Sequence, residues 1–220
     1  MEETKSVLSS YSIRMPKEKF VLSVDDFVRF DVAFQDDEMF RLLFRVAFVG
    51  GLRISETIGL QVSSFYPDRN SLLINRQACD HLKTGKTEII SPKTEKSIRW
   101  VYLPDFLVSE ISYWIRMNNM DDDCFLFHGS SLRYPIGANT VRRRLRYGIQ
   151  KSKLPYFSFH AFRRSEASLL NDAGLSGDVI SGFLGHDSFK TAQRYYLGDS
   201  DQKKEAVRKA LNEVLGPKFK

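Results

Sequence analysis

The sequence predicts an α+β domain that is mainly α-helical and carries one small three-stranded antiparallel sheet. Apolar residues recur with helical spacing near both ends of the chain, for example along residues 39–49 and 201–215. Between them, residues 71–103 form the only region that alternates strand-like runs with turn signals. A chain of 220 residues is long enough for one domain with a sizeable core.

Helices are expected both before and after the predicted strands in the sequence. Ser23 is a good helix N-cap and two aspartates follow it, so a helix should begin there and run to about residue 34. The apolar helix 39–49 should end at Gly50-Gly51, and the next should open at Ile54. The remaining helices are predicted to begin at Asp105, to run from Asn139 as the cap to Lys151, and to span 160–173, 176–183, 189–196 and 201–215.

The predicted sheet is a meander. Residues 71–75, 87–90 and 97–103 are rich in strand-forming residues, and turn signals precede each of them. Short connections favour pairing between strands that are consecutive in the chain. We therefore expect these three strands to pair in sequence order.

Charge and composition favour a polyanion as the partner. The net charge is +6 and the sequence pI is about 9.3. Residues 141–165 contain eight basic residues and no acid, which predicts a basic surface suited to a phosphate backbone. The chain has no apolar run of membrane-spanning length, no signal-peptide core, and two cysteines without metal-ligand spacing, so a cytoplasmic protein is expected.

Five side chains form a candidate site for phosphate chemistry. Arg53 follows a double glycine, and His160 and Arg163 share one face of a predicted helix. His186 follows a glycine that ends a helix, and Tyr195 comes nine residues later. Two guanidiniums can hold one phosphodiester, a histidine can move protons, and an activated tyrosine can attack phosphorus.

The motifs resemble those of the tyrosine recombinases, or phage-type integrases, in the same order. They are Gly51-Leu52-Arg53-Ile54-Ser55-Glu56, His160-Ala161-Phe162-Arg163, Leu184-Gly185-His186 and Tyr195. The resemblance spans roughly residues 20–200 and is greatest to integrases of conjugative transposons and temperate phages. It implies a helical DNA breaking-rejoining catalytic domain. Departures from the common pattern fall at Ala161, Phe162 and Arg164, none of which is a catalytic position in the family.

This resemblance implies a mechanism without metal or nucleotide cofactors. The nucleophile would attack the scissile phosphate and form a 3′-phosphotyrosyl link, which keeps the bond energy for rejoining. The implied roles are Tyr195 as the nucleophile, Arg53 and Arg163 on the phosphate, Lys93 on the leaving 5′-oxygen, His160 in proton transfer at the nucleophile, and His186 in hydrogen bonding to the phosphate.

Some assignments stay open at this point. The spacing from His186 favours Tyr195 over Tyr196, and Lys93 fits its turn better than Lys96 or Lys86. The basic residues predicted to contact DNA, or alternatively to form only a solvated helix face, are Arg142, Arg143, Arg144, Arg146, Lys151 and Arg164.

The predicted organisation has three parts. Residues 1–19 are a tail or linker, and residues 20–200 form the catalytic domain. Residues 201–220 form a helix that packs on its own domain or, as in relatives, on a neighbouring protomer. Relatives also carry an N-terminal core-binding domain, which residues 1–19 are too short to form, so we expect an excised catalytic domain or a short family member. The implied partners are double-stranded DNA, further copies in a tetrameric synapse, and accessory DNA-bending proteins, in a nucleoid-associated setting without a membrane.

Three other functions compete with this interpretation. A catalytically silent DNA-binding domain would not need the nucleophile, and a type IB topoisomerase-like enzyme would share the chemistry but need no partner duplex. A metal-dependent phosphodiesterase would use His160, His186 and Asp187. Such sites usually gather several carboxylates and histidines, and this chain has only four histidines.

Overall fold

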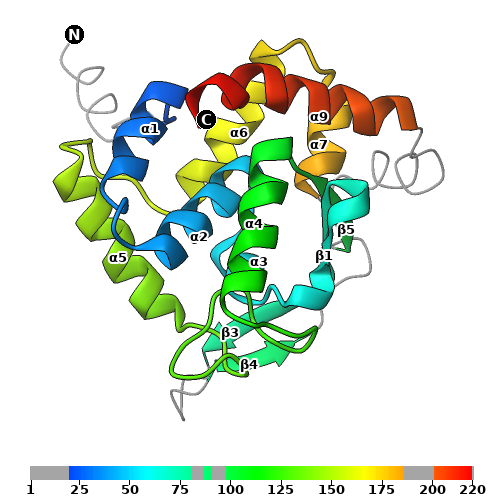
Figure 1. The fold of residues 1–220 in the computed structure, drawn as a ribbon. Coiled ribbons are helices and arrows are strands. Elements are labelled where there is room, and N and C mark those ends of the chain that lie inside the picture. Colours follow the sequence, from blue (N-terminus) through cyan, green and yellow to red (C-terminus); the bar gives the residue numbers. More distant parts are fainter. Residues whose placement is uncertain (1–19, 81–86, 91–97, 186–200, 220) are drawn as a thin grey trace, which may run out of the picture.

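The computed structural model describes residues 20–80, 87–90, 98–185 and 201–219. This part of the chain is mainly helical with small antiparallel sheets (Figure 1), so the predicted fold class is confirmed. The predicted helix 189–196 lies outside the described residues. The helices are α1 (Val24–Val32), α2 (Glu38–Val49), α3 (Ile54–Ile58), α4 (Asp105–Met117), α5 (Ala138–Lys151), α6 (His160–Asp172), α7 (Gly177–Leu184) and α9 (Asp201–Leu215). None of the described helices has the length and apolar character needed to cross a membrane.

The helix starts follow local capping chemistry. The Ser23 hydroxyl accepts a hydrogen bond from the Asp26 amide, and the Asp26 carboxylate accepts one from the Ser23 amide, both 3.1 Å long. This reciprocal pair satisfies two amides at the start of α1, so the predicted cap is confirmed. The predicted cap of α5 was wrong, because Gly137 precedes the helix. The Asn139 side chain lies inside its first turn and accepts a hydrogen bond from Arg142 instead.

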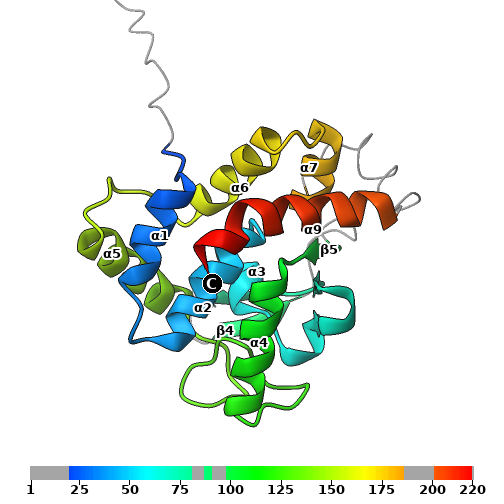
Figure 2. The same cartoon turned by 45° about the horizontal axis from the view of Figure 1, so that its top comes forward.

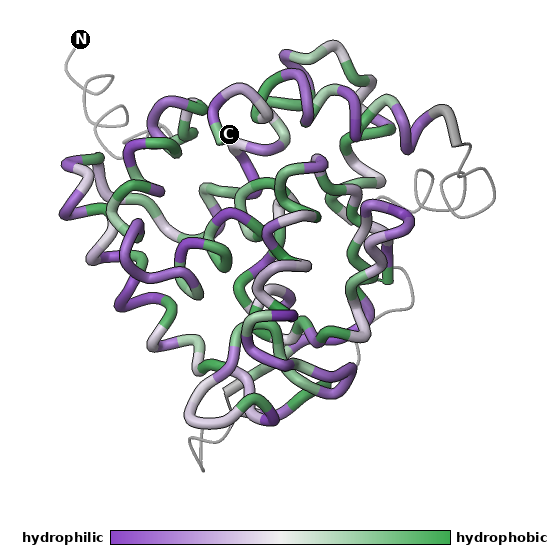
Figure 3. The backbone as a smooth tube through the Cα atoms, viewed as in Figure 1, coloured by the Kyte–Doolittle hydropathy of each residue, from purple (hydrophilic) through white to green (hydrophobic). Residues whose placement is uncertain are grey.

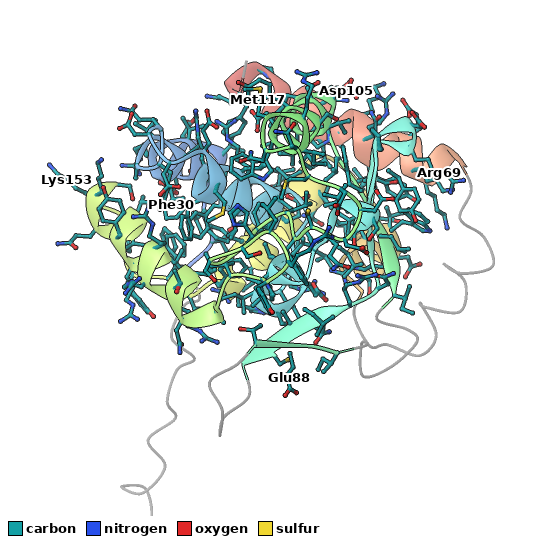
Figure 4. All side chains as sticks on the ribbon, turned by 60° about the horizontal axis from the view of Figure 1, so that its bottom comes forward. Phe30, Arg69, Glu88, Asp105, Met117 and Lys153 are labelled. Carbon is teal, nitrogen blue, oxygen red and sulfur yellow. The ribbon has the colours of Figure 1, made fainter. Side chains whose placement is uncertain are left out.

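The strands do not form the predicted meander. One sheet has the order β1 (Phe65–Tyr66), β2 (Ser71–Ile74), β5 (Arg99–Tyr102), and β3 (Gln77–Asp80) pairs with β4 (Thr87–Ile90) in a separate hairpin. Burial explains the difference. Leu72 of β2 lies opposite Val101 of β5 and both are fully buried, whereas β4 exposes Glu88, Ile89 and Ile90. In Figure 4 the β3–β4 hairpin projects from the body, with Glu88 pointing outward.

The core is rich in phenylalanine, and Phe162 of α6 lies among six other phenylalanine rings. Its ring centroid is 5.3–6.2 Å from those of Phe27, Phe30, Phe44, Phe48, Phe157 and Phe159. Edge-on and tilted ring pairs at such distances stabilise beyond their buried area. Figure 4 shows Phe30 inside the body of the protein. This packing fixes α6, and with it His160 and Arg163, against α1 and α2.

The C-terminal helix α9 packs on its own domain in this structure. It crosses the molecule beside α6 and above α4 (Figures 1 and 2). Its inner face buries Val207, Leu211 and Leu215, and Asn212 accepts a hydrogen bond from the Asp105 amide at the start of α4. Docking of this helix on a neighbouring protomer stays a prediction.

Candidate active site

Arg53 is held at the start of α3 by a carboxylate on the same helix. Glu56 accepts hydrogen bonds from the Arg53 amide and from Nη1 of its guanidinium, both 2.8 Å long. Glu56 is 1% exposed, whereas the Arg53 side chain keeps 38% of its surface exposed. The guanidinium is therefore oriented by a buried anion and remains accessible, as a phosphate ligand must be.

A second arginine, Arg99 of β5, holds the other side of the same carboxylate. Its Nη1 and Nη2 donate to the two Glu56 oxygens at 3.0 and 2.9 Å. Burial tends to raise the pKa of Glu56, but the charge and hydrogen bonds of Arg99, with those of Arg53, lower it to about 2. Glu56 is therefore an anion throughout the neutral range. Arg99 was missed by sequence reasoning, because it lies in a strand outside every motif.

Arg163 joins two motifs that are far apart in the chain. Its Nη1 donates a 2.9 Å hydrogen bond to the Gly51 carbonyl, and its Nη2 donates to the Leu184 carbonyl. The residue is only 2% exposed. The Arg163 guanidinium thus binds two backbone carbonyls, one just before Arg53 in the chain and the other just before His186.

His160 is exposed at the first residue of α6, one turn before Arg163. The helix therefore places a solvent-facing imidazole and a buried guanidinium at the same end. The other predicted catalytic residues, Lys93, His186 and Tyr195, lie outside the described residues, as do the alternatives Lys86, Lys96 and Tyr196. The structure brings Arg53, His160 and Arg163 to one region, together with Gly185, the residue before His186.

Two glycines allow this close assembly. Gly51 has a φ of 56°, and a Cβ there would lie 2.4 Å from Cδ2 of Leu184. Gly185 has a φ of 65°, and a Cβ there would lie 2.9 Å from Cδ of Arg99. Neither the backbone conformation nor the space suits a larger residue.

Glu166 is a second residue that sequence reasoning missed. It lies three residues after Arg163 and is fully buried, and its carboxyl oxygens have no hydrogen-bond partner among the described residues. Burial raises the pKa of this carboxyl well above its usual range. The sequence did contain a signal for Glu166: it is an acidic residue on a helix face whose other residues are typical of a hydrophobic core.

Comparisons with known proteins show the family of the chain. The family model described as the phage integrase family matches residues 23–202. The chain belongs to the phage integrase family. The ICEBs1 integrase of Bacillus subtilis (strain 168) is 27% identical over 193 residues, which are 82% of this chain and 50% of that protein. The tyrosine recombinase XerC of Myxococcus xanthus is 30% identical, over 70% of this chain and 49% of its own length. The chain spans about half the length of the curated relatives it matches.

Solved structures share the fold of this family member. The Tn1549 transposon integrase, solved in complex with a circular intermediate DNA, aligns with a TM-score of 0.67 at 20% identity and covers 89% of this chain and 67% of its own. The XerA recombinase aligns with a TM-score of 0.65 at 21% identity and covers 92% and 66% of the two chains. At these identities the match shows the fold.

The basic residues predicted to contact DNA in this integrase family member fall into two groups. Arg142, Arg143, Arg146 and Lys151 are exposed on α5, along which hydrophilic and hydrophobic segments alternate (Figure 3). Arg144 instead forms an ion pair with Asp37, and its guanidinium lies 4.7 Å from the centroid of the Phe40 ring. Arg164 donates to the Phe20 carbonyl at 3.1 Å. The structure therefore gives the last two arginines intramolecular partners.

Proposed function

We propose that this chain is the catalytic domain of a site-specific DNA recombinase that cleaves and rejoins DNA through a 3′-phosphotyrosyl intermediate. The observation that carries the proposal is the pair of hydrogen bonds from Arg163 to the carbonyls of Gly51 and Leu184. These bonds draw the Arg53 motif, the His160 motif and the segment leading to His186 to one place. Membership of the phage integrase family supports the same conclusion.

In the proposed cleavage step, the phenolic oxygen of Tyr195 attacks the scissile phosphorus. The bond from phosphorus to the 5′-oxygen breaks, and Lys93 gives the leaving oxygen its proton. His160 assists proton transfer at the nucleophile, and Arg53 and Arg163 bind the non-bridging oxygens of the phosphate. For Arg163 this requires an edge of its guanidinium to turn toward the DNA, because the residue is buried in the structure.

Rejoining reverses these bonds. The 5′-hydroxyl of a partner duplex attacks the phosphotyrosyl phosphorus, the tyrosyl oxygen leaves, and the new phosphodiester has the same bond type as the old one. The sequence of steps is balanced without a metal ion or a nucleotide, because the phosphotyrosyl link conserves the bond energy. His186 hydrogen-bonds the phosphate in both directions.

The proposed partners are double-stranded DNA, further copies of the chain in a tetrameric synapse, and accessory DNA-bending proteins. The exposed arginines of α5 support the first, because Arg142, Arg143 and Arg146 present positive charges on one helix. The DNA complex of the Tn1549 transposon integrase, which has the same fold, also supports it. A nucleoid-associated location follows from the same proposal.

The test is covalent capture of DNA. A pool of nicked suicide duplexes with randomised sequence around the nick is incubated with the protein in EDTA, and covalent adducts are separated and sequenced. The nick lets the 5′-hydroxyl fragment diffuse away, so the adduct accumulates. We expect the wild-type chain and Tyr196→Phe to form adducts and Tyr195→Phe to form none.

Each other outcome points to a different function. An adduct that survives Tyr195→Phe and is lost in Tyr196→Phe moves the nucleophile by one residue. Loss of the wild-type adduct in EDTA favours a metal-dependent phosphodiesterase. DNA binding without any adduct favours a silent binding domain, and relaxation of supercoiled plasmid without a partner duplex favours a topoisomerase-like enzyme.

The lysine assignment has its own test. Lys93→Ala should slow adduct formation on an ordinary phosphodiester, while Lys96→Ala and Lys86→Ala should not. A duplex with sulfur in place of the bridging 5′-oxygen should restore the Lys93→Ala rate, because a thiolate leaves without a proton. Failure of this rescue would remove Lys93 as the general acid.

A further inference from the structure

Arg99 contacts two separate segments of the candidate site, although it belongs to none of the motifs. It is the first residue of β5, it is 7% exposed, and it forms the forked ion pair with Glu56. Since Glu56 also binds the amide and guanidinium of Arg53, one buried carboxylate receives four hydrogen bonds from two arginines. The orientation of Arg53 therefore depends on a carboxylate whose other side is held by Arg99.

The same guanidinium also reaches the end of α7. Its Nε donates a 3.1 Å hydrogen bond to the Phe183 carbonyl. Two residues later, Gly185 packs against the Arg99 side chain so closely that a Cβ would lie 3.3 Å from Nε and 3.4 Å from Nη1. Each of the three guanidinium nitrogens thus has an acceptor: Nη1 and Nη2 bind Glu56, and Nε binds the carbonyl at the end of α7.

Geometry makes arginine specifically suited to this position. A planar fork can bind both carboxylate oxygens while its third nitrogen points to a different acceptor. A lysine ammonium is a compact point charge and cannot reach all three acceptors with fixed directions. The chain itself offers a comparison: Arg45 forms an equally buried fork on Asp31, at 2.7 and 2.6 Å, and has no hydrogen bond to Glu56 or to the end of α7.

From these contacts we infer that Arg99 is a positioning residue for strand cleavage, which orients Arg53 through Glu56 and holds the end of α7, the helix that precedes His186 in the chain, through the Phe183 carbonyl. The inference rests on the proposed recombinase function. Arg99 is buried and each of its guanidinium nitrogens donates to a protein acceptor, so the proposed role acts through other residues. One side chain thus binds both the carboxylate that orients Arg53 and the end of the helix that precedes His186 in the chain.

The experiment compares Arg99→Lys with Arg45→Lys, because both replace a buried forked arginine and keep its charge. Melting is followed by circular dichroism, DNA affinity by fluorescence anisotropy, and cleavage by the single-turnover rate of adduct formation on a duplex that the wild-type chain captures. We expect both variants to lose stability. Only Arg99→Lys should slow cleavage, by roughly tenfold to a hundredfold at saturating DNA, because small misplacements of reacting groups have effects of this size.

The pH dependence of the cleavage rate distinguishes a positioning role from a simple loss of stability. Arg99→Met removes the main charge that keeps Glu56 ionised, so Glu56 should take up a proton at a higher pH than in the wild type. The cleavage rate of Arg99→Met should therefore fall as the pH is lowered over a range where the wild-type rate is constant. Arg99→Lys, which keeps a positive charge, should shift this fall less.

Different results would overturn the positioning role of Arg99 and the recombinase function. Wild-type-like cleavage by folded Arg99→Lys, or equal slowing by Arg45→Lys, overturns the positioning role and leaves the recombinase proposal intact. Absence of adduct from the wild-type chain and from Arg45→Lys overturns the recombinase proposal, and the positioning role fails with it.

Discussion

The side chain of Glu166 packs against Gly51, where a Cβ would lie 3.4 Å from Cγ of the glutamate. A fully buried carboxyl thus lies beside the turn that carries Arg53, and on the same helix as Arg163. A charged group in this place would lack both water and a hydrogen-bond partner among the described residues. Burial therefore raises the pKa of Glu166 and favours its neutral acid over the charged form.

Replacing Glu166 should therefore stabilise the fold, and more so at higher pH. The folded-state pKa is raised, so the folded protein holds a proton that the unfolded chain releases above its own pKa of about 4.5. Stability is then lost as the pH rises above that value. Glu166→Leu should unfold in urea with a free energy higher by about 1–3 kcal/mol near neutral pH. A variant less stable than the wild type at every pH would show that the carboxyl has a necessary partner.

Replacing Gly51 should be destabilising. Alanine there would have to adopt a left-handed conformation, costing about 1 kcal/mol, and would clash with Leu184. We expect Gly51→Ala to lower the free energy of unfolding by about 2–4 kcal/mol. Gly177→Ala is the control, because nothing lies within 4 Å of its Cβ position. Equal thermal melts for the two variants would contradict the close approach of the Gly51 turn and α7.

Glu56 should give the opposite pH dependence to Glu166. Its folded-state pKa is lowered from 4.5 to about 2, so its stabilising effect is full above pH 4.5 and is lost as the pH falls toward 2. The shift corresponds to about 3 kcal/mol. Glu56→Gln should lose most of this free energy at neutral pH in urea titrations. The free energy of unfolding of this variant should also depend less on pH below 4.5. An unchanged dependence in this range would disprove the role of the Glu56 carboxylate.

Neighbouring arginines of α5 should behave differently in DNA binding. Arg143 is exposed, so Arg143→Ala should leave stability within about 0.5 kcal/mol and reduce the salt dependence of DNA affinity by about one phosphate contact. Arg144 pairs with Asp37 and packs on Phe40, so Arg144→Ala should cost about 1 kcal/mol of stability and change the salt dependence less. Anisotropy titrations over a salt series, with urea unfolding of both variants, test this contrast. The reverse pattern would place Arg144 on the DNA.

Local sequence patterns determine much of this protein. The Ser23 cap, the apolar periodicity of α2 and the glycine that ends α7 can all be predicted from the sequence, because each depends on residues close together in the chain. The order of the motifs likewise predicts the family and the residues that matter for its chemistry. The pairing of β2 with β5 cannot be predicted in this way, because their register depends on burial against a core built from distant helices.

Only the tertiary structure decided which groups meet. Nothing in the local sequence of Arg99 distinguishes it from a solvated strand residue, yet it reaches Glu56, 43 residues away, and the Phe183 carbonyl, 84 residues away. In the same way, α5 carries three consecutive arginines, and packing alone turned Arg144 inward to Asp37. The sequence determined the helices and the chemistry available to the site. Long-range packing decided which cations are ordered by buried partners and which are left exposed, because those contacts form only when distant segments are brought together.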